Sequence, residues 1–161
     1  MQFPKINEKI IIVDFGSQLT KLIARRIREL GVYSEIITPT DVLKLKNFIS
    51  IKGIILSGGP STVTKRNYQS IPKTIFNKNI PILGVCYGLQ LISKLLGGKI
   101  KSSKKRREFG RAFIFKSKES LLTKNFFKSK SAVWMSHEDA VVKLPANFKS
   151  IAYTADSKLT A

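Results

Sequence analysis

The sequence predicts an α/β protein built on a doubly wound, mostly parallel sheet with an antiparallel extension. Three observations lead to this prediction. The chain has 161 residues, which suits one domain, and 43% of them are hydrophobic, too many for a disordered chain. Short apolar runs alternate with segments of helical periodicity as far as Gly98, and only strand-like runs follow.

The first elements follow a strand–helix–strand pattern. Residues 9–15 (KIIIVDF) form a β-branched apolar run, typical of a strand buried on both faces. In residues 16–31 leucine and isoleucine recur at helical spacing, with Ser17 as a candidate N-cap and Gly31 as the stop signal. Residues 32–37 (VYSEII) predict the next strand.

The pattern then repeats. A short helix is expected to begin at Thr40 or Asp41. Residues 53–57 form an apolar strand, which ends at the Gly-Gly-Pro turn of residues 58–60. Another short helix is expected over residues 71–76.

A fourth strand, at residues 80–85, leads into Cys86, and a helix over residues 89–98 follows, closed by Gly97 and Gly98. Beyond it, short strand-like runs are separated by polar or turn-forming residues and predict the antiparallel extension. These runs are residues 111–117, 131–137, 140–144 and 150–155.

The formal net charge of +19 raises the question of a nucleic-acid partner. The basic residues are mostly lysines spread along the chain, with one dense block at residues 99–111. No zinc-finger spacing and no aromatic–basic RNA motif accompany them. We therefore expect a solvated lysine-rich surface, part of which faces an anionic substrate or a partner domain, and no nucleic-acid partner.

The single cysteine allows no internal disulfide and no cysteine-rich metal site. No apolar run is long enough to span a membrane, and the N-terminal residues lack the pattern of a signal peptide. These features predict a cytoplasmic protein with no bound metal.

That cysteine, Cys86, lies between Gly84 and Gly88, where a strand gives way to a helix. The G-x-C-x-G spacing matches the nucleophile elbow, a tight turn that exposes its central side chain. The N-terminus of the following helix is expected to favour the thiolate, which is the nucleophile. The alternatives are a small buried hydrophobic residue or a redox or hydrolase cysteine.

Acyl transfer also needs hydrogen-bond donors for the developing oxyanion. The backbone N–H of Tyr87, directly after the cysteine, is one natural donor. The N–H of Gly59, in the turn after the third strand, is another, because ligands bind beyond the carboxyl ends of the strands in open α/β sheets. The sequence therefore predicts a cysteine-dependent acyl-transfer site at this edge.

The segments GVCYGLQ and ILSGGP resemble the class I glutamine amidotransferases. The opening IIIVDFGSQLTKLIARRIRELGVYSEI, the KRREFGRA segment and VWMSHEDAV are similar to the amidotransferase domains of the GMP synthase family. The resemblance implies hydrolysis of glutamine to glutamate, with ammonia passed to a synthetase domain where XMP, activated by ATP, is aminated to GMP. It implies that ATP and Mg belong to that domain, that this domain binds no cofactor, and that the complete enzyme is a homodimer.

The resemblance also implies roles for individual residues near the elbow. Cys86 would be the nucleophile that forms a γ-glutamyl thioester. Gly59 and Tyr87 would form the oxyanion hole, in agreement with the spacing argument. Gln90, one turn into the helix, would face the amide end of the substrate.

A second group of residues, in the MSHED segment, would bind the other end of glutamine. Ser136 and His137 are expected to hold it largely through main-chain contacts, and Asp139 to brace their loop. His137 matches this positioning loop of the family rather than its general base. Glu138 stands where the family usually has glycine, and it either weakens binding or points into solvent.

The family's general base is a His followed two residues later by an orienting Glu, in a motif of the FHPE type. These 161 residues contain no such motif and no synthetase domain. We therefore expect residues 1–161 to be an amidotransferase domain incomplete at its C-terminus, from a fragment or a truncated gene. On its own it is expected to be marginally stable and to hydrolyse glutamine poorly.

Two other functions fit part of the sequence. One is that of a different class I amidotransferase, against which the VDFGSQ and MSHED segments argue. The other is a degenerate amidotransferase fold that does not catalyse and presents its basic surface to a partner or to nucleic acid.

Overall fold

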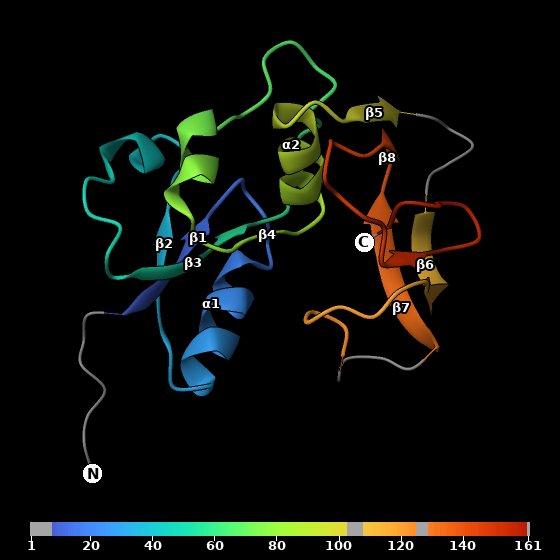
Figure 1. Cartoon of the computed structure of the whole chain (residues 1–161), viewed down its shortest axis with the longest axis horizontal. Coiled ribbons are helices and arrows are strands. Elements are labelled where there is room, and N and C mark those ends of the chain that lie inside the picture. Colours follow the sequence, from blue (N-terminus) through green and yellow to red (C-terminus); the bar gives the residue numbers. More distant parts are fainter. Residues whose placement is uncertain (1–7, 103–107, 125–128, 161) are drawn as a thin grey trace. The chain divides into compact units, whose positions relative to one another are not determined.

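The computed structural model describes residues 8–102, 108–124 and 129–160 (Figure 1). The chain divides into two compact units, Met1–Ile92 and Ser93–Ala161. The first unit contains the parallel sheet and the second contains antiparallel sheets. The predicted α/β class, with a parallel sheet and antiparallel strands after it, is confirmed.

The first unit is built on a four-stranded parallel sheet with the strand order β2-β1-β3-β4. The connection from β1 to β2 and the connection from β3 to β4 run in opposite directions, which makes the sheet doubly wound. Figure 1 shows α1 on one side of the sheet and η2 on the other. The strands are β1 (Lys9–Val13), β2 (Tyr33–Ile37), β3 (Ile51–Leu56) and β4 (Ile82–Gly84).

The apolar runs of the sequence form the interior of this sheet. Ile12 of β1, which is fully buried, lies opposite Ile55 of the neighbouring strand β3. Burying such a side chain contributes about 1.5–3 kcal/mol relative to leaving it exposed, so these runs specify which strands are central. The apolar side chains buried in the first unit include Ile11, Ile12, Val13, Ile54, Leu56 and Leu91.

Two α-helices and two short 3-10 helices connect or follow the strands: α1 (Thr20–Glu29), η1 (Asp41–Lys44), η2 (Lys73–Lys78) and α2 (Tyr87–Leu95). The prediction of Ser17 as the N-cap of the first helix is wrong, because Leu19 occupies that position. The hydroxyl of Ser17 instead accepts a hydrogen bond of 3.1 Å from the N–H of Leu19, which stabilises the turn before the helix. Gly31, with φ of +79°, follows the helix as predicted.

The second unit contains two antiparallel sheets, β5-β8 and β7-β6-β9. Strand β5 was not predicted, since its sequence KIKS contains a single apolar residue, Ile100. Of the basic block at residues 99–111, residues 103–107 lie outside the described part of the chain. The strands are β5 (Lys99–Ser102), β6 (Glu108–Lys116), β7 (Lys130–His137), β8 (Asp139–Lys143) and β9 (Ala152–Tyr153).

Strand β7 alternates between half-buried and exposed residues along its whole length. This period of two is typical of an antiparallel sheet that packs on one face and is solvated on the other. Val133 and Met135 belong to the half-buried set, and Ala132 and Trp134 to the exposed set.

Among the described helices, none is long and apolar enough to cross a membrane.

Candidate active site

Three strand ends of the first unit meet around Phe15. The N–H of Phe15, just after β1, donates a hydrogen bond of 3.0 Å to the hydroxyl of Ser57, just after β3. The Phe15 ring packs against the ring of Tyr87, the first residue of α2, with centroids 5.0 Å apart. A Cβ on Gly59 would lie 2.4 Å from the carbonyl oxygen of Phe15, so only glycine fits there. The carboxyl ends of β1, β3 and β4 therefore form one packed edge.

Cys86 occupies the turn between β4 and α2 with φ of +48°, a conformation that L side chains rarely adopt. Its two flanking glycines cannot carry side chains. A Cβ on Gly84 would lie 2.5 Å from the N of Leu89, and one on Gly88 would lie 2.2 Å from the carbonyl oxygen of Leu56. The G-x-C-x-G spacing thus corresponds to a strained strand-to-helix turn, as the sequence predicted.

The side chain of Cys86 is exposed rather than sealed in the core. The protein atoms around the sulfur nevertheless desolvate it, and this partial burial raises the pKa of the Cys86 thiol above its ordinary value. The direction is opposite to the thiolate stabilisation expected from the helix N-terminus. In this structure Cys86 therefore needs a proton acceptor to become a nucleophile near neutral pH.

The two amides predicted to form an oxyanion hole both belong to the first unit. The loop after β3 lies against the cysteine, since a Cβ on Gly58 would be 3.6 Å from the Cβ of Cys86. Within the described ranges, the N–H of Gly59 donates no hydrogen bond. Tyr87 begins α2, and the first N–H groups of a helix have no partner inside it. Both amides are thus suited to donate hydrogen bonds to an anionic ligand.

The side chains of Tyr87 and Gln90 are buried. The hydroxyl of Tyr87 donates a hydrogen bond of 2.5 Å to the carbonyl oxygen of Gln69, and burial together with neighbouring Tyr68 raises the pKa of Tyr87 to about 12. Gln90 donates its backbone N–H to the carbonyl oxygen of Cys86 at 3.1 Å. These contacts fix the first turn of α2 behind the cysteine.

The other predicted site residues belong to the second unit. Ser136 and His137 end β7, opposite Phe109 and Glu108 of β6. Asp139, which begins β8 opposite Ser102, is buried with 6% of its surface exposed. The structure therefore groups Cys86, Gly59, Tyr87 and Gln90 in one unit and these three residues in the other. Glu138, between them, is exposed.

Comparison with known proteins decides the family. The family model described as "Glutamine amidotransferase class-I" matches residues 11–161. The chain belongs to the class I glutamine amidotransferase family. The amidotransferase chain is also 30% identical to a solved structure from Thermoplasma acidophilum, provisionally named as part of a GMP synthase, with a TM-score of 0.82 and coverage of 94% of this chain and 75% of that one.

Curated relatives are more similar in sequence. The amidotransferase chain is 49% identical over 159 residues to the glutamine-hydrolyzing GMP synthase of Treponema denticola, covering 99% of this chain and 30% of that protein. It is 44% identical over 154 residues to the enzyme of the same name from Staphylococcus carnosus, covering 94% of this chain and 29% of that protein. The chain thus spans about a third or less of the length of these relatives.

Two positioning residues of this amidotransferase edge were missed by sequence reasoning. Ser57, which is fully buried, bridges the ends of β1 and β3 through its hydrogen bond to Phe15. Asp14 accepts hydrogen bonds of 2.9 Å from the N–H of Gly16 and 2.7 Å from the hydroxyl of Thr20. Partial burial acts to raise the pKa of Asp14, but these hydrogen bonds outweigh it and hold that pKa below its usual value. In the sequence, the only indication that Asp14 and Ser57 belong to the site was that they lie in the VDFGSQ and SGGP segments.

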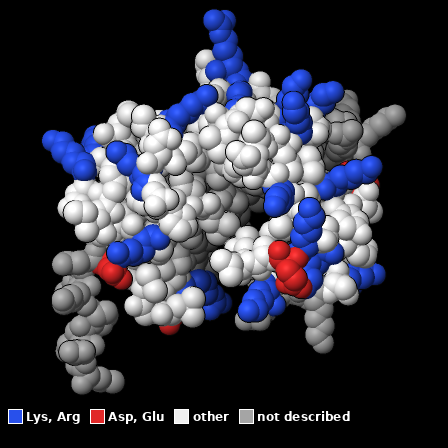
Figure 2. All heavy atoms as spheres, viewed as in Figure 1, with Lys and Arg blue, Asp and Glu red and all other residues white. Residues whose placement is uncertain are grey.

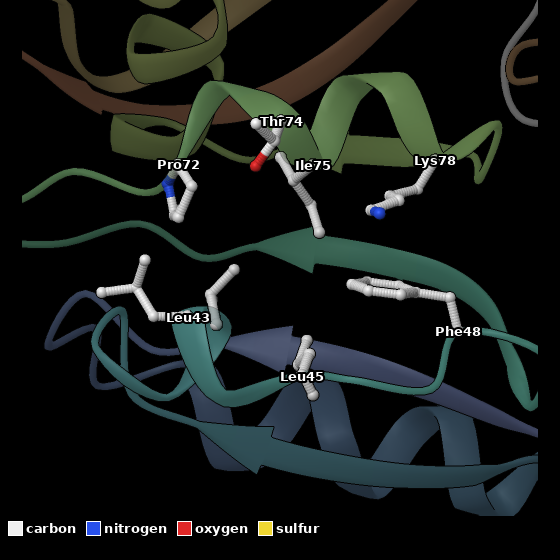
Figure 3. Close-up of a pocket in the computed structure, with 8 residues that line it drawn as sticks. Leu43, Leu45, Phe48, Pro72, Thr74, Ile75 and Lys78 are labelled. Atoms are coloured by element: carbon white, nitrogen blue, oxygen red, sulfur yellow. The ribbon is translucent and has the colours of Figure 1, made fainter.

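A pocket of about 170 Å³ lies elsewhere on the first unit, between η1 and η2 (Figure 3). None of the predicted site residues lines it. Its one charged side chain is Lys78, whose Nζ lies over the Phe48 ring, 5.0 Å from the centroid. The remaining lining residues are Val42, Leu43, Leu45, Pro72, Thr74 and Ile75.

Lysine and arginine side chains are scattered over the face of the molecule in Figure 2, with few acidic side chains among them. This distribution agrees with the lysine-rich surface expected from the sequence.

Among the described residues, no three His, Cys, Asp or Glu side chains gather into a group that could hold a metal ion.

Proposed function

We propose that this chain is the glutamine-hydrolysing portion of a GMP synthase, with Cys86 as its nucleophile. The observation that carries the proposal is the exposed Cys86, held at positive φ beside the Gly58–Gly59 loop. Its support comes from the family membership and from the relatives named GMP synthase. Those relatives argue against the alternative of a different class I amidotransferase.

In the proposed reaction the sulfur of Cys86 attacks the side-chain amide carbon of glutamine. The amide oxygen gains negative charge and accepts hydrogen bonds from the N–H groups of Gly59 and Tyr87. The C–N bond then breaks, the nitrogen leaves as ammonia after taking up a proton, and a γ-glutamyl thioester remains on Cys86. Water hydrolyses the thioester to glutamate and restores the thiol.

Four further residues are proposed to bind or support the substrate, as the family resemblance implies. Gln90 would lie at the amide end of glutamine, and Ser136 and His137 would hold the amino-acid end through their main chains. Asp139, buried at the start of β8, would fix the end of strand β7 that carries them, where the sequence predicted a loop. The exposed Glu138 is proposed to point into solvent.

Proton transfer from Cys86 is proposed to be the slow step in this polypeptide. The raised pKa of Cys86 means that a base must accept its proton near neutral pH. The resemblance assigns that base to a His-x-Glu motif, and the one histidine of these 161 residues is His137, at the end of β7. The 161-residue polypeptide alone is therefore expected to turn over glutamine slowly.

Ammonia is proposed to pass to a synthetase partner that activates XMP with ATP and aminates it to GMP, in the cytoplasm. ATP and Mg would be bound by that partner and not by this chain. The homodimer expected of the complete enzyme is part of the same proposal.

A glutamine-analogue electrophile tests the proposed nucleophile without requiring turnover. The intact chain should be labelled at Cys86, and an excess of glutamine should slow the labelling. The variant Cys86→Ser should remain unlabelled, while Ser70→Ala, at an exposed residue in the same unit, should be labelled like the parent. Labelling that glutamine does not slow would refute a glutamine site at Cys86. Turnover of glutamine by the isolated chain at the rate of a complete enzyme would refute the proposed deficit in proton transfer.

A further inference from the structure

The strand register of the second unit gathers aromatic and basic side chains on one exposed face. In the antiparallel pair β6–β7, Arg111 lies opposite Trp134 and Phe113 opposite Ala132. Because side chains alternate between the two faces of a strand, every second residue of β6 shares this face with its partner on β7. The aromatic–basic face is defined by Phe109, Arg111, Phe113, Lys130, Trp134 and Tyr153, and Phe115, Ala132 and Ser136 share it.

Contacts between the side chains confirm that they share one face. The Nζ of Lys130 lies 4.0 Å from the centroid of the Phe113 ring, and the guanidinium carbon of Arg111 lies 5.6 Å from it. Tyr153 of β9 stacks on Phe115, with centroids 5.4 Å apart. The cations are therefore held beside the rings by cation–π contact.

These rings are unusually exposed for a folded protein. The exposed fraction is 82% for Trp134, 62% for Phe109, 44% for Phe113 and 41% for Tyr153. The opposite face, with buried Ile114 and half-buried Val133, supplies the packing side of the sheet. Large exposed apolar groups that cluster in this way mark a binding surface.

The charge of the face indicates the kind of partner. No acidic residue occurs at the β6, β7 or β9 positions of this described face, which carries Arg111 and Lys130. Residues 93–161 contain 16 Lys and Arg against 5 Asp and Glu, a net charge of +11. A purely apolar partner would have to desolvate these cations, whereas a polyanion would neutralise them.

Contrary to the expectation from the charge pattern of the sequence, we propose that the aromatic–basic face binds single-stranded nucleic acid. Unpaired bases stack on exposed aromatic rings of a sheet, and flanking cations neutralise the phosphates. Trp134 and Phe109 are the stacking platforms, because they are the most exposed rings and lie diagonally across the strand pair. Arg111 and Lys130 are the phosphate contacts. This activity does not depend on the proposed hydrolysis of glutamine.

The sole tryptophan of the chain supplies a direct readout. A single-stranded oligouridylate of about 12 nucleotides, within the site sizes common for such surfaces, is titrated into the full 161-residue chain at low salt. Stacking on Trp134 should quench its fluorescence in a saturable manner. A duplex of the same length should bind about tenfold more weakly, because its bases are already stacked. Absence of quenching, or equal quenching by the duplex, overturns the proposal.

Paired variants distinguish binding by the aromatic–basic face from attraction by the general positive charge of the chain. Phe109→Leu should weaken binding about tenfold or more, whereas Tyr33→Leu, at an exposed ring of the first unit, should not weaken it. Each phosphate contact contributes about 0.7 to the slope of log K against log salt. The double variant R111A/K130A removes two such contacts and should therefore reduce the slope by about 1.4. The double variant K46A/K65A, at exposed lysines of the first unit, removes the same charge and should leave the slope nearly unchanged.

A polyglutamate of similar charge distinguishes an acidic protein partner from nucleic acid. It should leave the Trp134 fluorescence unchanged, since it has no rings to stack. Quenching by polyglutamate as strong as that by the oligonucleotide overturns the proposal in favour of an acidic protein. Equal effects of R111A/K130A and K46A/K65A overturn it in favour of unspecific charge attraction.

Discussion

The ring of Tyr87 packs against the ring of Phe15, with centroids 5.0 Å apart and planes inclined by 43°. This contact joins the first residue of α2 to the end of β1, at the edge where Cys86 is exposed. The hydroxyl of Tyr87 extends the connection to the carbonyl oxygen of Gln69. One buried aromatic residue thus fixes the first turn of the helix that follows Cys86.

The hydroxyl of Tyr87 should contribute to stability. Tyr87→Phe keeps the ring contact but removes the part-buried hydrogen bond to the carbonyl oxygen of Gln69, and should lower the free energy of unfolding by about 0.5–1.5 kcal/mol. Denaturant unfolding measures the difference, with Tyr33→Phe at an exposed ring as the control. An unchanged midpoint for Tyr87→Phe would show that water replaces the bond without loss.

The same hydroxyl predicts a pH dependence. Burial raises the pKa of Tyr87 to about 12, above the value of about 10 for an unfolded tyrosine, so the folded chain holds this proton more tightly. Its contribution to stability is therefore complete below about pH 10 and is lost as the pH rises towards 12. Over that range the unfolding free energy of the parent should fall more steeply than that of Tyr87→Phe. Parallel curves would contradict the raised pKa.

The thiol of Cys86 should titrate above an ordinary cysteine, because burial raises its pKa. A raised pKa means a smaller thiolate fraction at a given pH, so the pH midpoint of alkylation by iodoacetamide should lie above the midpoint of the unfolded chain. The same chain in denaturant provides the reference curve. A midpoint below the denatured one would show that the helix N-terminus prevails over desolvation.

The backbone of Cys86 should be strained. In the left-handed region an L side chain costs about 1–2 kcal/mol, so Cys86→Gly should unfold less readily than Cys86→Ala by about 1 kcal/mol. At Arg25, on the exposed side of α1, the same pair should show the opposite order, because glycine weakens a helix. Thermal unfolding compares the four variants, and equal stability of the two Cys86 variants would remove the evidence for strain.

The loop after β3 depends on the absence of a side chain at Gly59. Gly59→Ala would bring a Cβ within 2.4 Å of the Phe15 carbonyl oxygen and should lower the unfolding free energy by about 1–3 kcal/mol. It should also slow labelling of Cys86 by the glutamine analogue, since the amide of residue 59 is displaced. Gly58→Ala is the matched control for stability, because its Cβ would meet Cys86 at an ordinary 3.6 Å. A stable, fully labelled Gly59→Ala chain would contradict the proposed role of this loop.

Much of the fold and the position of the cysteine could be predicted from local pattern. Apolar runs fixed the four parallel strands to within a few residues, and glycine spacing around Cys86 indicated the elbow. Strand β5 escaped prediction because Ile100 alone gives no period of two. The direction of the thiol pKa shift could not be predicted from local pattern, since desolvation depends on atoms that are distant in sequence.

The sequence by itself determined most of the strand segments, where the chain must turn, and to which family it is similar. These follow from local periodicity and from residue types that only certain turns accept. Tertiary structure alone decided that Ser57 supports Phe15 and that Trp134 lies opposite Arg111. The physical reason is strand register: pairing between strands selects which side chains share an edge or a face, and a shift of one residue would exchange them all.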